Sequence, residues 1–323
     1  MSTPATHILL AALPDNERMT VDAAWSPTAY ARNGDVEIAY DRFGEGGGVP
    51  LLLSMGLAMS RFFWPDGLCR AFADAGFDVV RYDQRDAGES TRFGRAERRG
   101  PWAALLGKET VAYTSEDMVD DAVAVLDAVG WERAVVFGAS MGGALAQRFA
   151  LRHPDRVLAV VSNGAAPSDV SGLGVLRYVR FGLLAKLAMT KFPEGREGDV
   201  AVLMAVARGL ASPANPVDED EARAWVEREL GSGPRDNDAQ SRQLGAKWSG
   251  PRLREVRAPV LALHGADDPL MRTSASRAVA RAIPGAKLLV LDGVGHDLPR
   301  AAWKVVAEQT RRLVESDGVP GEG

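Results

Sequence analysis

The sequence predicts an α/β protein with a doubly wound, mostly parallel sheet. Short continuous apolar runs, which are typical of buried parallel strands, alternate with amphipathic helical stretches along most of the chain. The alternation is interrupted once by a long helical segment and then resumes before the C-terminus. The 323 residues are 46% hydrophobic and 25% charged, which is typical of a globular protein with a large core.

Strands and helices follow one another in order through the first half of the chain. The alternation of Val36, Ile38 and Tyr40 predicts a half-buried strand. Buried strands are then predicted at residues 49–56, 77–83, 132–138 and 155–164, and helices before Gly76 and at residues 114–130 and 142–153. The helix at 114–130 opens with a capping box that joins Thr114 and Asp117.

Between about residues 165 and 253 the sequence has helical stretches and no convincing strand. Helices are predicted there at 173–190, 199–210 and 218–230, whereas strands resume at 258–265 and 286–293 and a helix at 301–314 closes the fold. We therefore expect one core, residues 29–164 and 254–315, interrupted by a helical insertion at 165–253. Residues 1–28 are expected to be an N-terminal extension without a clear period, and residues 316–323 a flexible tail.

Composition and charge exclude several classes of partner. The formal net charge is −5 with both signs interspersed, so no basic block suits a nucleic acid or an anionic membrane surface. Cys69 is the only cysteine, which excludes an intrachain disulfide, and its helical context predicts a small buried hydrophobe. The N-terminus lacks the features of a signal peptide, and no run approaches the ~18 apolar residues of a membrane span. We expect a cytoplasmic protein, and its oligomeric state stays open.

Three glycines surround one serine in the stretch AVVFGASMGGALAQ, where a predicted strand meets a predicted helix. A side chain at the apex of so sharp a turn projects away from the sheet on strained backbone. Gly138 and Gly142 are small where side chains would collide, and the free N–H groups of the helix start can stabilise an oxyanion. The stretch lacks the Lys-Ser/Thr of a P-loop and the G-x-G-x-x-G spacing of a dinucleotide-binding motif. Ser140 is therefore predicted to be a nucleophile.

A serine hydroxyl needs a base, and the chain offers four histidines. His7 lies in the N-terminal extension, and His153 ends the helix behind the serine, where it is expected to face away from the site. His264 ends a strand and is expected to be packed there. His296 lies on a loop after the last predicted strand, at the carboxyl edge of the sheet, and is the predicted general base.

The base needs a carboxylate that fixes its tautomer and stabilises the imidazolium. Asp267 and Asp268 both follow a predicted strand, and Asp268 is the preferred partner, with Asp169 as the fallback. Asp292 and Asp297 are expected to be turn and surface groups. The order serine, aspartate, histidine along the chain is that of the α/β-hydrolases.

The attacked carbonyl also needs two N–H donors for its developing negative charge. The N–H of Met141 follows the serine, and the N–H of Leu57 lies on the loop after the strand at residues 49–56, which leaves the same edge of the sheet. This chemistry needs no metal and no other cofactor, and the sequence predicts none.

Five motifs occur in the order of the α/β-hydrolase superfamily: LLLSMG, FDVVRYDQRDAGES, VVFGASMGG, LALHGADDPL and GVGHDLP. On these motifs the chain resembles the serine esterases of that superfamily from about residue 33 to 315. Over residues 51–90 it resembles the aclacinomycin methylesterase group, whose members hydrolyse a methyl ester on an aromatic polyketide glycoside. The resemblance implies a mostly parallel eight-stranded sheet and a helical cap at 165–253. It also implies Ser140, Asp268 and His296 as the triad, with Leu57 and Met141 as backbone donors.

One position departs from the pattern of the superfamily. Most members have His-Gly at the end of the strand before the oxyanion loop, whereas this chain has Met55-Gly56, as the methylesterase group does. The loop thus lacks the polar side chain that usually ties it down. The charged stretch RYDQRDAGES is expected to be a structural turn in which Arg85 pairs with Asp86.

The cap carries more apolar residues than a thin surface helix needs, namely Leu176, Phe181, Leu184, Leu187 and Met189. Most of them are expected to pack the cap against the core. Phe181 and Leu184 are expected to line a substrate pocket together with Gly56, Phe62 and Trp64. Such walls favour an apolar, polycyclic ester.

The leading hypothesis is a serine carboxylic ester hydrolase that acts through an acyl-enzyme on a small apolar ester, of the polyketide methyl ester type. Thioesterase, lactonase, amidase and perhydrolase activities stay open because the same triad serves them all. A dehalogenase is disfavoured because it needs an aspartate at the position of Ser140. Two other classes also stay open: a ligand-binding protein on a hydrolase scaffold, and a cofactor-free lyase or oxygenase that uses His296 and Asp268 without acylation.

Overall fold

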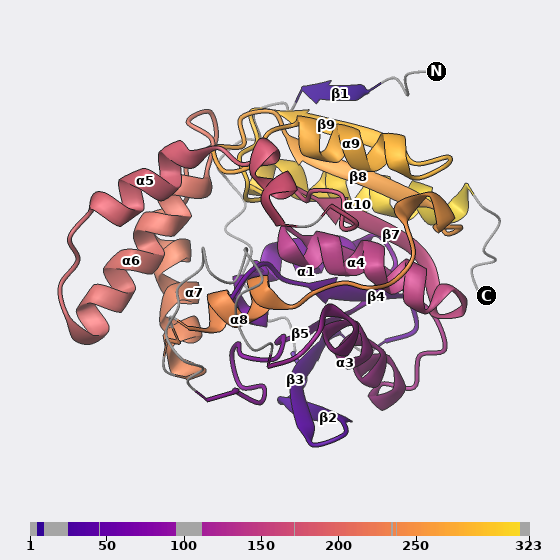
Figure 1. Ribbon diagram of the computed structural model, residues 1–323, viewed down its shortest axis with the longest axis horizontal. Helices are drawn as coiled ribbons and strands as arrows, with labels where there is room; N and C mark the ends of the chain where they lie inside the picture. The colour runs from indigo at the N-terminus through magenta and orange to yellow at the C-terminus, as the bar shows by residue number, and fades with distance from the viewer. Residues whose placement is uncertain are drawn as a thin grey trace.

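A computed structural model of the protein describes residues 5–9, 25–44, 46–94, 112–170, 172–233, 235–236 and 238–316. Within these residues nine strands form one sheet in the order β1-β9-β8-β7-β6-β4-β5-β3-β2. The strands from β5 through β4, β6, β7, β8 and β9 to β1 are parallel, and β2 and β3 are antiparallel to their neighbours. The sheet twists through the centre of the molecule (Figure 1).

The strands are β1 (Thr6–Leu9), β2 (Ala29–Asn33), β3 (Val36–Phe43), β4 (Val49–Ser54), β5 (Phe77–Tyr82), β6 (Ala134–Ala139), β7 (Val157–Asn163), β8 (Val260–Gly265) and β9 (Lys287–Asp292). The helices of the core are α1 (Asp66–Asp74), α3 (Ser115–Ala128), α4 (Met141–Arg152), α9 (Ser274–Ala282) and α10 (Arg300–Glu315). Between β7 and β8 the chain forms α5 (Phe181–Met189), α6 (Gly195–Leu210), α7 (Glu219–Gly231) and α8 (Ala239–Gly245).

Helices cover both faces of the sheet, and each face has its own apolar core. On one face α1 and α10 contribute buried side chains such as Phe72 and Val306, which pack with alternate residues of the central strands. On the other face α3, α4 and α9 contribute side chains such as Leu126 and Phe149. Burial on both faces explains why the central strands are continuous apolar runs in the sequence.

The structure confirms the α/β fold and most of the predicted elements. The capping box at the start of α3 is present, because the Thr114 hydroxyl accepts from the Asp117 N–H and the Asp117 carboxylate accepts from the Thr114 N–H. Cys69 is buried in α1 as expected. Two core elements were not predicted from the sequence: the short edge strand β2 and the helix α9.

The sheet has nine strands where eight were expected. The additional strand is β1, which lies within the N-terminal extension and pairs in parallel with β9. Its four residues, THIL, are too few to show a periodic pattern, so the strand can be recognised only from its pairing with β9. The rest of residues 1–24, and residues 317–323 of the expected tail, lie outside the described residues.

The helices between β7 and β8 project to one side of the sheet (Figure 1). The predicted helix at 173–190 is in fact a 3-10 helix at Gly172–Tyr178 followed by α5, and α8 was not predicted. Helices α6 and α7 share a small apolar core that includes Leu203, Met204 and Val226. No helix of the described residues is long and apolar enough to cross a bilayer.

Candidate active site

The turn between β6 and α4 holds Ser140 in a conformation that side-chain-bearing residues rarely adopt, with φ of 54°. The turn closes only because its neighbours are glycines. A Cβ on Gly138 would lie 2.0 Å from the carbonyl oxygen of Gly142, and a Cβ on Gly142 would lie 2.0 Å from the carbonyl oxygen of Ser54. The glycine spacing in the sequence therefore reflects backbone-to-backbone contact on both sides of the serine.

Asp268 and His296 form a buried pair. His296 Nδ1 lies 2.6 Å from Asp268 Oδ2, and the two side chains are 7% and 1% exposed. The other carboxylate oxygen of Asp268 accepts hydrogen bonds from the N–H groups of Leu270 and Met271, at 2.8 and 2.7 Å. Burial acts to raise the pKa of Asp268, but the charge and hydrogen bond of His296 outweigh it, and the pKa lies below its ordinary value. Asp268 is thus held as a carboxylate.

The end of β7 joins this pair to the serine. The Ser140 N–H donates to the carbonyl of Asn163 at 2.8 Å, and the next residue, Gly164, has φ of 59°. A Cβ on Gly164 would lie 3.0 Å from His296 Cε1 and 3.7 Å from Asp268 Oδ2. Ser140 and the His296–Asp268 pair therefore flank the same two residues at the carboxyl edge of the sheet. No hydrogen bond joins Ser140 Oγ to His296 within the described residues, and this contact is commonly long before substrate binds.

The other histidines have structural partners. His264 is fully buried, with Nδ1 2.8 Å from the Ser276 hydroxyl and Nε2 3.2 Å from the Met271 carbonyl, and burial lowers its pKa. His153 bonds to Asp120 at 2.8 Å, behind α4, and His7 lies 3.4 Å from Asp292.

The other candidate carboxylates lie elsewhere. Asp267 accepts from the Ser212 hydroxyl, and Asp169 accepts from the Leu253 N–H. Asp297 is not the surface group that we expected: its Oδ1 is buried without a hydrogen bond to the described residues, and burial raises its pKa to about 7.

The two predicted oxyanion donors lie on either side of the serine. A Cβ on Gly56 would be 3.3 Å from Ser140 Cβ, so the loop that carries Leu57 passes directly against the serine turn. Met141 is the first residue of α4, where N–H groups have no partner within the helix. Neither the Leu57 N–H nor the Met141 N–H donates a hydrogen bond to any described residue.

Polar side chains from distant elements hold the loop that carries Leu57. Their hydrogen bonds take the place of the polar side chain that we expected to be missing at Met55. Gln84 Nε2 donates to the Met55 carbonyl at 2.5 Å. Gln243 of α8 accepts from the Ala58 N–H at 2.7 Å, at a residue with φ of 54°, and its Nε2 donates to the Arg85 carbonyl at 2.9 Å. The turn after β5 and the inserted helices therefore hold the loop in place.

Glu229 of α7 is a second tie from the inserted helices. Its carboxyl group bonds to the Ser60 hydroxyl and lies 3.2 Å from the Ser60 N–H. Burial raises the pKa of Glu229 to about 7; the charge of Asp83 also raises it, and the hydrogen bonds of Ser60 and the charge of Arg92 lower it. Neither Gln243 nor Glu229 was found from the sequence, because nothing in a polar helical stretch marks which residue turns inward. Gln84, in contrast, lies within one of the five motifs, FDVVRYDQRDAGES.

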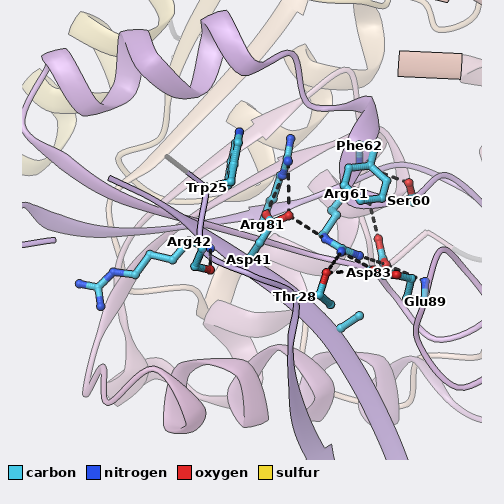
Figure 2. A network of polar contacts seen from close by, with 12 residues as sticks. Trp25, Thr28, Asp41, Arg42, Ser60, Arg61, Phe62, Arg81, Asp83 and Glu89 are labelled. Carbon is cyan, nitrogen blue, oxygen red and sulfur yellow. Dashed lines mark hydrogen bonds and ion pairs between the residues drawn. The ribbon is translucent and has the colours of Figure 1, made fainter. Parts of the chain in front are cut away.

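Arg61 anchors the far end of the loop with a guanidinium that is fully buried. It bonds to the carboxylates of Asp41, Asp83 and Glu89 and to the hydroxyl of Thr28, and its own N–H donates to Asp83 at 2.6 Å (Figure 2). One side chain therefore joins the loop to β3, to the turn after β5 and to the segment before β2.

The stretch RYDQRDAGES is a structural turn, but its pairing differs from our expectation. Arg85 pairs with Asp121 of α3 at 2.6 Å, and Asp86 pairs with Arg242 of α8 at 2.8 Å. The two neighbours in sequence point in different directions, so each finds a partner on another element. Sequence adjacency had suggested the wrong partners.

The predicted pocket residues are dispersed. Gly56 lies against Ser140. Trp64 is buried with its ring edge against Phe137, and Phe62 stacks on the guanidinium of Arg61, with ring centroid and Cζ 4.3 Å apart. Phe181 and Leu184 lie on α5 and are each 44% exposed. The expectation that the apolar residues of this segment pack on the core is wrong for α5, which buries none of its side chains.

Comparison with known proteins places the chain in a family. The model of the alpha/beta hydrolase fold family matches residues 49–299, and the chain belongs to this family. It is 30% identical over 301 residues to a rhodomycin D methylesterase of Streptomyces sp. (strain C5), and the alignment covers 87% of this chain and 96% of the relative. A rhodomycin D methylesterase of Streptomyces peucetius is also 30% identical, over 307 residues with the same coverage.

Among solved structures, an esterase from Rhodococcus sp. ECU1013 superposes with a TM-score of 0.68 at 21% identity, and the match covers 90% of this chain and 99% of that one. This likeness shows the fold. Together, the family match and the methylesterase relatives show a hydrolase that acts on esters.

Replacement of Arg61 by leucine should strongly destabilise the protein, because it leaves the buried Asp83 without its counter-charge and Asp41 with Arg81 alone. Breaking a buried pair in this way typically costs about 3–5 kcal/mol, which urea unfolding would record as a lower midpoint. The matched control is Arg196→Leu, whose exposed pair with Glu227 is worth at most about 1 kcal/mol. Equal shifts in the two variants would contradict a structural role for the Arg61 network.

The raised pKa of Glu229 predicts a pH-dependent stability. The folded protein binds this proton more tightly than the unfolded chain, so the stabilisation is complete below the ordinary pKa of 4.5 and is lost as pH rises through about 7. A shift of this size corresponds to about 3 kcal/mol. Glu229→Gln should therefore lose less stability than the wild type between pH 5 and pH 8, as measured by unfolding free energies.

Glu227→Gln is the control on the same helix, at an exposed position. Asp297 titrates in the same range but is present in every one of these proteins, so it cancels from the difference. A pH dependence that is unchanged in Glu229→Gln would show that the Glu229 proton is not bound more tightly in the fold.

Proposed function

We propose that the protein is a serine carboxylic ester hydrolase that works through an acyl-enzyme, with Ser140 as nucleophile, His296 as general base and Asp268 as its partner. The observation that carries this proposal is the buried 2.6 Å pair of His296 and Asp268 beside a serine held at a strained strand-to-helix turn. Oriented bases next to activated hydroxyls are the recurring arrangement of acyl-transfer enzymes.

The pair sets the protonation state that the first step needs. Because Nδ1 of His296 faces the carboxylate of Asp268, Nδ1 carries the proton and Nε2 is left as the acceptor. Nε2 takes the proton of the Ser140 hydroxyl as Oγ attacks the ester carbonyl, and the carboxylate stabilises the imidazolium that forms. The negative charge on the former carbonyl oxygen is accepted by the N–H groups of Leu57 and Met141.

Collapse of the tetrahedral intermediate releases the alcohol, which His296 protonates as it leaves. Water then attacks the acyl-enzyme with the same imidazole as base, and a second intermediate on the same N–H donors releases the acid and restores Ser140. The loop that carries Leu57 must keep its N–H in place through both steps. Its ties to Gln84 and Gln243 supply that rigidity.

For the substrate we propose an apolar ester, of the methyl ester type with a large polyketide-like acyl group. The two methylesterase relatives that align over most of this chain support this choice. Thioesters, lactones, amides and perhydrolysis use the same triad chemistry and are the alternatives that a substrate panel would separate. A cytoplasmic location remains a prediction from the sequence.

Ser140→Ala should lower kcat by a factor on the order of 10⁶, because members of a triad act as a unit. Turnover of a p-nitrophenyl ester would measure the loss, with Ser316→Ala, at an exposed serine far from the turn, as the control. Labelling with a serine-directed organophosphonate should add one adduct mass on Ser140 of the wild type.

A variant that keeps most of its esterase activity would refute the nucleophile. The adduct also separates the other classes: a ligand-binding protein would take no label, and a lyase that uses only His296 and Asp268 would tolerate Ser140→Ala with a modest loss of its own activity.

Gln243→Ala should lower kcat by up to about 100-fold while KM changes little, because a displaced oxyanion donor weakens the transition state more than substrate binding. Gln243 touches the loop and is a positioning residue in this scheme. Gln240→Ala, at an exposed glutamine of the same helix, is the matched control and should retain wild-type kinetics. A rise in KM with unchanged kcat in Gln243→Ala would argue against the oxyanion role.

A further inference from the structure

Helix α5 is apolar around its circumference and yet is not buried. Its sequence, FGLLAKLAM, has one charged residue, Lys186, and none of its side chains is fully buried, although Leu183 and Leu187 are partly so. A helix that is hydrophobic all round is ordinarily found inside a protein or in lipid. The inserted helices therefore expose a surface that lacks a covering partner within the described residues.

The two apolar sides of α5 have different environments. At about 100° per residue, Leu183 and Leu187 share one side of the helix. Leu183 lies against α6, where a Cβ on Gly209 would be 2.4 Å from its Cδ1. Phe181 and Met189 lie on the opposite side and Leu184 on the flank next to Leu187, and these three side chains are 44%, 78% and 44% exposed. Figure 1 shows α5 next to α6 at the edge of the molecule, to one side of the sheet.

The exposure of large hydrophobic side chains is concentrated in this part of the chain. The described residues expose six such side chains, of which four lie between residues 173 and 189: Leu173, Phe181, Leu184 and Met189. Scattered single exposures need no explanation, but a contiguous apolar surface marks a site of interaction.

The charge of the same segment selects the partner. Residues 172–191 contain four basic residues, Arg177, Arg180, Lys186 and Lys191, and no Asp or Glu, although the whole chain has a net charge of −5. Among the described residues no ion pair neutralises Arg180, Lys186 or Lys191. Arg180 lies with Asp267 and Asp268 at a hollow beside the candidate site, whereas Lys186 lies within α5 and Lys191 just after it. Whole-chain composition had predicted no anionic membrane partner because its basic residues are dispersed, but the structure sets these two lysines beside an apolar face.

We propose that α5 and the residues that flank it form a docking surface for an anionic lipid bilayer, on which Phe181, Leu184 and Met189 enter the interface and the lysines contact lipid phosphates. An apolar face flanked by basic residues is the composition of helices that lie in the membrane interface. A second copy of the chain fits less well, since a two-fold contact through α5 would bring the same positive charges together.

The start of α5 is joined to the candidate active site. The Arg180 N–H donates to the carbonyl of Leu270 at 2.8 Å, and the Arg272 N–H donates to the carbonyl of Tyr178 at 2.7 Å. Leu270 is also one of the two residues whose N–H groups hold Asp268. A bilayer that binds α5 would therefore hold the candidate site near the surface where apolar esters dissolve. The docking proposal itself does not depend on the proposed esterase chemistry.

The test is co-sedimentation of the full chain with vesicles made of equal parts of phosphatidylglycerol and phosphatidylcholine, against vesicles of phosphatidylcholine alone. The wild type should bind the anionic vesicles, and salt at about 1 M, where the Debye length is about 3 Å, should release it. Lys186→Glu with Lys191→Glu should weaken binding by roughly 30-fold, since each surface lysine contributes about a factor of 5. Met189→Asp should also weaken it.

Matched controls keep the test specific. Tyr30→Asp places an acid at an exposed aromatic residue on β2, away from α5, and Lys304→Glu reverses an exposed charge on α10. Both should bind vesicles as the wild type does. All variants should keep wild-type turnover of a soluble p-nitrophenyl ester, so loss of docking and loss of catalysis are measured separately.

The proposal is overturned if the wild type does not bind anionic vesicles, or if Met189→Asp and the double lysine variant bind as well as the two controls. Sedimentation velocity adds a third decisive outcome. A wild-type dimer that Met189→Asp dissociates, without vesicle binding, would make α5 a contact between copies of the chain.

Discussion

The site depends on one close approach of backbones, between the first turn of α4 and the ends of β4 and β6. Both Gly138 and Gly142 have a carbonyl oxygen 2.0 Å from where a Cβ would stand, so no other residue fits at either position. This packing forces the positive φ of Ser140 at the bend between β6 and α4. It also brings the N–H of Met141 and the loop after β4 to the side chain of that serine. The geometry of the site is therefore a consequence of backbone packing, before any charge is considered.

The loop after β4 has to be held by something other than the histidine that many relatives of this fold use there. In this chain Met55 offers only a carbonyl, and the loop is fixed by amide and carboxyl groups that reach it from elsewhere. Burying a charge such as the Arg61 guanidinium is costly unless its donors are satisfied, and here four oxygen-bearing side chains meet it. Such a network contributes little net stability but disfavours any other arrangement of the loop, which is what a pre-organised oxyanion site needs.

Much of the fold was predictable because local patterns were strong where burial was uniform. The central strands are apolar on both faces. Gly138 and Gly142 are required by steric contacts that any strand-to-helix bend of this kind imposes. The four-residue β1 was not predictable, because its strand character arises from pairing with β9. The partners of Arg85 and Asp86 were wrong for a related reason: ion pairs form between elements that the fold brings together, and proximity in sequence carries little information about them.

For the candidate site, residue types and order along the chain identified Ser140, Asp268 and His296, and the structure brings their backbones to one edge of the sheet. The inserted helices were predicted only as helices, since their roles depend on which face meets the core. Helices α7 and α8 turn Glu229 and Gln243 onto the loop after β4, whereas α5 packs on α6 and presents its other apolar face outward. One insertion therefore has two unequal halves. The half that touches the loop is constrained by its hydrogen bonds to that loop, and the half that does not is free to keep an exposed apolar and basic surface without disturbing the proposed active site.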